Sequence, residues 1–120
     1  MQQTVIIADD AQFMRLMLKD ILEDLGLRVV AEAKDGRQAV ADYRELRPDL
    51  IMLDMDGIKT FDRIQNLRPG IPVILSSGYT VSEQVNDLMA RGCRGFIQKP
   101  FSIHELSIRV RRILDYRRAG

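Results

Sequence analysis

Short apolar runs alternate along the chain with longer segments in which apolar residues recur every third or fourth position. The runs occupy residues 5–8, 29–31, 50–53, 73–75 and 95–98. Runs that are apolar almost throughout predict strands buried on both faces, and the three-to-four spacing predicts amphipathic helices. The pattern therefore predicts five strand–helix units in succession.

Residues that cap or terminate helices support the helical segments of this pattern. Asp35 precedes the second helical segment as a candidate N-cap, and Thr80 with Glu83 and Ser102 with Glu105 form candidate capping boxes. Helix stops are predicted at Gly26, Pro48, Pro69–Gly70 and Gly92. Buried strands joined by helices indicate an α/β protein, a doubly wound parallel sheet with helices on both faces.

The composition restricts the function further. The 120 residues are enough for one domain spanning 1–120 and too few for a two-domain enzyme. A formal net charge of +1 gives no electrostatic reason to expect nucleic-acid binding. No apolar run approaches the roughly 20 residues of a membrane span, and the N-terminus lacks signal-peptide features, so we expect a cytoplasmic protein with no membrane contact. With one cysteine (Cys93) and one histidine (His104), any metal must be held by oxygen ligands.

Polar residues follow four of the predicted strands: Asp9 and Asp10 the first, Asp54 the third, Ser77 the fourth and Lys99 the fifth. The carboxyl ends of parallel strands share one edge of a sheet, where ligands bind. If the first and third strands are neighbours, three carboxylates converge there, and their repulsion requires a cation. Oxygen ligands favour Mg²⁺ or Mn²⁺. One carboxylate could then attack a phosphoryl group while Lys99 and Ser77 stabilise the transferring oxygens.

Each residue also has a simpler interpretation. Asp9 and Asp10 could cap the first helix, Lys99 could be a surface lysine, and Ser77 alone says little. Their joint position at independently predicted strand ends favours a site. Elsewhere we expect Cys93 to be buried, His104 to be exposed, and the C-terminal arginines to form a solvated helix face. These arginines are Arg109, Arg111, Arg112, Arg117 and Arg118.

Four segments make the chain resemble the receiver domains of two-component response regulators, particularly the single-domain chemotaxis type. They are residues 7–10 (IADD), 48–54 (PDLIMLD), 72–78 (PVILSSG) and 99–101 (KPF). The resemblance implies the flavodoxin-like strand order 2-1-3-4-5. It also implies that Asp54 accepts a phosphoryl group from the phosphohistidine of a histidine kinase.

The same resemblance implies roles for the other site residues. Asp9, Asp10, Asp54 and Asp56 would hold Mg²⁺, Asp56 through its backbone carbonyl. Lys99 would contact the phosphoryl group, Ser77 would be the switch hydroxyl and Phe96 the switch aromatic. One departure is large: between the acceptor and the Asp-Gly that opens the third helix, the family carries a Met-Pro loop about five residues longer. The third helix must therefore begin almost at once, or its first turn must unwind.

Two other functions remain open. Residues 54–57 (DMDG) also resemble the nucleophile motif of haloacid-dehalogenase-like phosphatases, with Asp54 as nucleophile and Asp56 as acid or base. That motif normally follows the first strand, and its downstream acid pair is absent here. The other alternative is a pseudo-receiver, an interaction module that works without phosphorylation.

We interpret the chain as a phosphoacceptor switch with no catalytic activity beyond its own phosphorylation and slow dephosphorylation. The readout face would comprise the fourth helix, the strand at 95–98 and the last helix. A separate downstream protein would bind this face, and the chain would be a monomer or a phosphorylation-dependent dimer.

Overall fold

The computed structural model describes residues 2–54, 58–68, 70–77, 86–87, 89–90, 93, 95–98 and 101–119; at 54, 58, 59, 77, 98 and 116–119 it describes only the backbone. Strands and helices alternate in the predicted order. The elements are β1 Thr4–Ala8, α1 Gln12–Asp24, β2 Arg28–Ala33, α2 Gly36–Leu46, β3 Leu50–Asp54, α3 Ile58–Leu67, β4 Val73–Ser77, β5 Gly95–Gln98 and α5 Ile103–Ala119.

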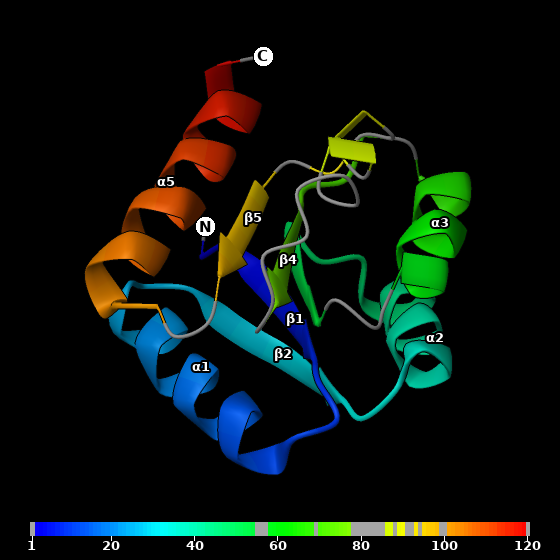
Figure 1. The fold of residues 1–120 in the computed structure, drawn as a ribbon, viewed down its shortest axis with the longest axis horizontal. Coiled ribbons are helices and arrows are strands. Elements are labelled where there is room, and N and C mark those ends of the chain that lie inside the picture. The colour runs from blue at the N-terminus through cyan, green and yellow to red at the C-terminus, as the bar shows by residue number, and fades with distance from the viewer. Residues whose placement is uncertain are drawn as a thin grey trace.

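The five strands form one parallel sheet in the order β2-β1-β3-β4-β5. This confirms the expected fold class and strand order. Helices α1 and α5 cover one face of the sheet, and α2 and α3 cover the other (Figure 1). The expected fourth helix falls between β4 and β5, where residues 86–87 and 89–90 have helical backbone and most other positions lie outside the described residues.

Two apolar clusters lie on opposite faces of the sheet because successive strand residues point to opposite sides. Ile6 and Ile51 belong to the cluster under α2 and α3, whereas Ile7 and Met52 belong to the cluster under α1 and α5. The central strands are thereby buried on both sides, as their apolar sequence predicts.

Local chemistry sets several of the helix ends. The Asp35 side chain accepts a hydrogen bond from the Gln38 N–H at 2.9 Å, and the Ser102 hydroxyl accepts one from the Glu105 N–H at 3.0 Å. The caps predicted at Asp35 and Ser102 are therefore confirmed, whereas the capping box predicted at Thr80 and Glu83 lies outside the described residues. Gly26 follows α1 with φ of 91°, the left-handed conformation that glycine adopts without steric cost. None of the described helices combines the length and apolarity needed to cross a membrane.

Candidate functional site

The carboxyl edge of the sheet brings together the ends of the strands that carry the candidate residues. Ala8 of β1 pairs with Leu53 of β3, so the next residues along each strand, Asp9 and Asp54, are neighbours in backbone position. Asp54 in turn pairs with Ser76 of β4. The predicted neighbourhood of the first and third strands is thus present at the backbone level.

Three hydrogen bonds hold Asp9 in place. Its N–H donates to the Ala33 carbonyl at 3.1 Å, and its Oδ1 accepts from the Ala11 N–H at 2.9 Å. Its carbonyl accepts from Nη1 of Arg15 at 2.5 Å. Asp9 is 5% exposed. These bonds fix the backbone at the point where the chain leaves β1 and turns towards α1.

The alternative role of Asp9 and Asp10 as caps of α1 is not what the structure shows. The N-cap residue of α1 is Ala11, which makes no side-chain cap hydrogen bond. The Asp9 carboxylate accepts from Ala11 itself, two residues on, which is a turn before the helix rather than a cap of it. Helix α1 therefore begins without either aspartate serving as its N-cap.

Sequence reasoning missed Arg15, a buried arginine on α1. Only 8% of its side chain is exposed; it donates to the Asp9 carbonyl, and its Nε lies 3.7 Å from Glu32 Oε1 on β2. Lys19 Nζ lies 4.0 Å from the other Glu32 oxygen. Arg15 thus links β2 to the turn that carries Asp9 and Asp10. Its position three residues before buried Leu18, on the apolar side of α1, was the available signal.

The donor set at this edge suits a hard divalent cation. Asp9 and exposed Asp10 supply carboxylate oxygens beside the backbone position of Asp54. Among the described residues no group of three or more His, Cys, Asp or Glu side chains gathers for a metal. The Asp54 side chain, Asp56 and Lys99 lie outside the described residues.

The two predicted switch residues lie on β4 and β5. The backbone of Ser77 ends β4 and pairs with Gln98, the last residue of β5. Phe96 of β5 is half-buried and packs against the cluster under α2 and α3. Arg109 of α5 donates to the Phe96 carbonyl at 2.7 Å, so this arginine has a specific contact in addition to its place on the exposed helix face.

Cys93 and His104 agree with their sequence interpretation. Cys93 is 4% exposed, and its thiol donates to the Gly95 carbonyl at 3.2 Å. Burial raises the pKa of the Cys93 thiol, which keeps it protonated and unreactive at neutral pH. His104 is exposed in the first turn of α5.

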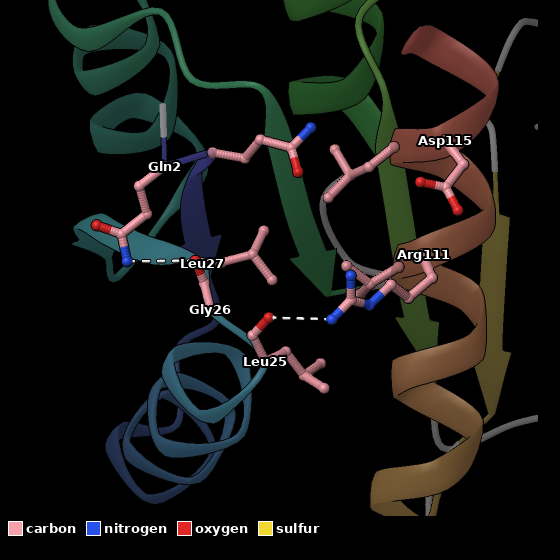
Figure 2. A pocket seen from close by; sticks show the side chains of 9 residues that line it. Gln2, Leu25, Gly26, Leu27, Arg111 and Asp115 are labelled. Carbon is pink, nitrogen blue, oxygen red and sulfur yellow. Dashed lines mark hydrogen bonds between the residues drawn. The ribbon is translucent and has the colours of Figure 1, made fainter. Parts of the chain in front are cut away.

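A recess at the opposite edge of the sheet has a structural explanation. Figure 2 shows it between the start of the chain, the turn after α1 and helix α5. Gln2 Nε2 donates to the Gly26 carbonyl at 3.2 Å, and Arg111 donates to the Leu25 carbonyl at 3.5 Å. These polar side chains thus bind the backbone of the turn after α1 and hold it against α5.

Together, the parallel sheet and the acidic turn at its carboxyl edge define an α/β protein with a candidate phosphoryl-transfer site. The family model for the response regulator receiver domain matches residues 5–111. The chain therefore belongs to the receiver domain family of response regulators. This membership favours a two-component phosphoacceptor over the haloacid-dehalogenase-like phosphatase.

Individual relatives agree with this assignment. The chain is 40% identical over 106 residues to the chemotaxis protein CheY of Thermotoga maritima, covering 84% of this chain and 88% of the relative. It is 38% identical over 120 residues to CheY of Bacillus subtilis, covering 96% and 100%. The crystal structure of a CheY-like receiver domain from Methanospirillum hungatei superposes with a TM-score of 0.91 at 23% identity over all of both chains, which supports the fold.

The shortened connection after Asp54 is consistent with these comparisons. The alignment with the Bacillus relative is 120 positions long and covers all of that protein, but it uses only 96% of this 120-residue chain, or about 115 residues. About five residues of the relative therefore have no counterpart in this chain. Helix α3 begins at Ile58, only four residues after Asp54. The prediction that the third helix begins almost at once is therefore confirmed, whereas the conformation of residues 55–57 lies outside the described part.

Proposed function

We propose that Asp54 accepts a phosphoryl group from the phosphohistidine of a histidine kinase and that this modification switches the binding of a separate target protein. The observation that carries the proposal is the register of β1 and β3, which makes Asp9 and Asp54 backbone neighbours at the ligand-binding edge of the sheet. Membership of the receiver family implies a phosphodonor kinase and a downstream target in general.

The proposed transfer uses groups of this chain around one carboxylate. An oxygen of Asp54 attacks the phosphorus, the bond between phosphorus and the histidine nitrogen breaks, and the imidazole leaves with its electron pair. Asp9 and Asp10, with the carbonyl of Asp56, would hold Mg²⁺, which neutralises charge on the phosphoryl oxygens when bound. Lys99 would contact the same oxygens as a compact cation.

The switch would act through the strands beside Asp54. Phosphorylation adds negative charge that Ser77 and Lys99 can satisfy, and Ser77 precedes the segment leading to β5. Phe96, half-buried on β5, would change its packing, and the Arg109 bond to its carbonyl would pass the change to α5. The partner would bind the surface formed by the predicted fourth helix, β5 and α5.

Further parts of the proposal concern the whole molecule. We infer that residues 1–120 act as one receiver unit in the cytoplasm, a monomer or a phosphorylation-dependent dimer, with no direct contact to nucleic acid or membrane. The family relationship and the near-neutral charge support these inferences. Catalysis would be confined to the chain's own phosphorylation and slow dephosphorylation.

The test is phosphorylation by acetyl phosphate with Mg²⁺, followed by intact-protein mass spectrometry. We expect a mass increase of one phosphoryl group that requires Mg²⁺ and is abolished by Asp54→Asn. Asp10→Asn should reduce the yield at limiting Mg²⁺, whereas Asp20→Asn, at an exposed position of α1, should leave it unchanged.

Two results would contradict the proposal. A modification that persists in Asp54→Asn would place the acceptor elsewhere. No mass increase in folded wild-type protein with saturating Mg²⁺ would favour the pseudo-receiver, the alternative to which the short connection between β3 and α3 points.

A further inference from the structure

A second cavity, of about 290 Å³, lies between the ends of α2 and α3. Its lining residues are Tyr43, Arg44, Arg47, Leu67 and Arg68, which we call the arginine pocket. Both helices end where the next strands, β3 and β4, begin. The pocket is therefore at the opposite edge of the sheet from Asp9 and Asp54, and the phosphorylation proposal does not use it.

The three arginines of the pocket lack partners within the described part of the chain. The side chains of Arg44, Arg47 and Arg68 make no hydrogen bond there and have no carboxylate oxygen within 4.0 Å. Arg15, Arg109 and Arg111 each donate to a backbone carbonyl, whereas the exposed Arg28, Arg37, Arg63 and Arg112 also have no partner among the described residues, so the pocket arginines are distinguished by sharing one cavity. Three positive side chains around one cavity repel one another and create a local site for a negative group.

The backbone of Arg47 gives a second, independent observation. Arg47 has φ of 44° and ψ of 67°, and it is the only described residue other than glycine with positive φ. This left-handed conformation ends α2, where the Arg47 N–H donates to the Tyr43 carbonyl at 2.9 Å. A side chain in this conformation costs roughly 1 kcal/mol, which glycine avoids and asparagine reduces. Because arginine at this position lowers the stability of the fold, we take its presence as an indication that the guanidinium group binds a ligand or partner.

Apolar surface adjoins the charge. Leu67 lines the pocket and is 43% exposed, and Leu46, the residue before Arg47, is 42% exposed. The buried Tyr43 side chain contributes to the wall. Arginine is enriched at protein interfaces, and exposed Leu67 adds apolar surface that a partner can cover beside the three arginines. A small inorganic anion would use only the arginines, whereas a polypeptide with acidic and apolar side chains would use the whole surface.

We propose that the arginine pocket binds an acidic segment of a partner protein, whose Asp or Glu carboxylates pair with Arg44, Arg47 and Arg68. Guanidinium groups bind carboxylates through two parallel hydrogen bonds, and neighbouring leucines of the segment would contact Leu46 and Leu67. This docking surface is separate from the proposed phosphorylation site and from the face formed by β5 and α5. It does not depend on phosphorylation of Asp54.

The experiment titrates the full-length, ¹⁵N-labelled protein with hexaglutamate peptide and follows amide chemical shifts. We expect saturable shifts at residues 43–47 and 67–68, which weaken as salt is added. Hexaglutamine should cause no such shifts, and inorganic phosphate should bind more weakly than hexaglutamate. Arg44→Gln and Arg68→Gln should each weaken peptide binding about threefold to tenfold. Arg112→Gln, at an exposed position of α5, is the matched control and should not change it.

Arg47→Asn separates binding from folding. Asparagine tolerates the left-handed backbone, so the melting temperature should equal or exceed that of the wild type while peptide affinity falls about threefold to tenfold. A merely structural arginine would not show this combination.

Three outcomes would overturn the proposal. In the first, hexaglutamate at millimolar concentration causes no shifts at the pocket. In the second, Arg112→Gln weakens binding as much as the pocket variants. In the third, phosphate binds as tightly as the peptide, which would make the pocket a simple anion site. Because none of these measurements involves Mg²⁺ or Asp54, they leave the phosphorylation proposal untouched.

Discussion

Arg15 matters at the scale of single residues because it is a buried charge that bonds a backbone carbonyl at the candidate site. Arg15→Met keeps an unbranched apolar stem but is too short to reach the Asp9 carbonyl and removes the hydrogen bond from Arg15. The Glu32 side chain is 30% exposed, so water can solvate its carboxylate once the arginine is removed. We expect the free energy of unfolding to fall by about 1–3 kcal/mol, measured by urea denaturation. Arg37→Met, at an exposed position of α2, should change it by less than about 0.5 kcal/mol.

The same variant tests whether Arg15 positions the acidic turn. A ligand that binds only the folded state raises stability, so Mg²⁺ should raise the urea midpoint of the wild type. The increase should be smaller in Arg15→Met, because the Asp9–Asp10 backbone loses one of its anchors. An equal Mg²⁺ effect in both proteins would show that Arg15 contributes only to folding.

At the scale of elements, the contact between α2 and α3 explains why glycine begins α2. A Cβ on Gly36 would lie 1.9 Å from Thr60 Oγ1 and 3.2 Å from Thr60 Cβ on α3. Thr60 is 7% exposed, so it has little room to move. Helix propensity alone would favour alanine by about 0.5–1 kcal/mol, but overpacking costs typically about 1–3 kcal/mol. We expect Gly36→Ala to lower the free energy of unfolding by about 1 kcal/mol.

Removing the obstructing atoms should reduce that destabilisation. Thr60→Ala deletes Oγ1 and Cγ2, so Gly36→Ala should cost much less in the Thr60→Ala background than in the wild type, as a double-mutant cycle would measure. If Gly36→Ala stabilises the protein in both backgrounds, the two helices do not pack as closely as this contact indicates.

The elements differ in how far the sequence alone could predict them. The five strands and the helices capped by Asp35 and Ser102 follow from local patterns and were predicted correctly, but burial on both faces was wrong for β2, an edge strand whose residues 28–32 are half-buried or exposed. Arg15 was missed because its partner, Glu32, lies on another element, and residue spacing does not reveal such a pair. The left-handed backbone of Arg47 was also missed, since Pro48 indicates only that the helix must end.

In the candidate site too, local sequence patterns predicted some features and could not predict others. Periodicity placed Asp9, Asp54 and Ser77 at strand ends, whereas the order that makes β1 and β3 neighbours came from the resemblance to receiver domains. The roles proposed for Asp54, Asp56 and Lys99 remain predictions, because they depend on side chains outside the described residues.

For the whole molecule, the position of each strand in the sheet predicts which backbone amides are exposed to solvent only on global unfolding. Strands β1 and β3 each have a strand on both sides and an apolar cluster on both faces, and Val5, Ile6, Leu50 and Ile51 are fully buried. Strand β2 is an edge strand whose residues 28–32 are half-buried or exposed. Local opening of an edge strand leaves the central core intact, whereas exposing the central amides requires global unfolding.

We therefore expect native-state hydrogen exchange of amides in β1 and β3 to be at least about 100-fold slower than that of the β2 amides bonded to β1. Low concentrations of denaturant should accelerate exchange at the central amides with the slope of global unfolding, because that reaction exposes the most surface. The β2 amides should show a smaller slope. If both sets follow one line with the same slope and the same free energy, the edge strand does not open on its own. The Asp9 N–H donates a hydrogen bond to the Ala33 carbonyl at the end of β2. If β2 does not open separately, a ligand bound at the Asp9 turn would stabilise the whole sheet and not β2 alone.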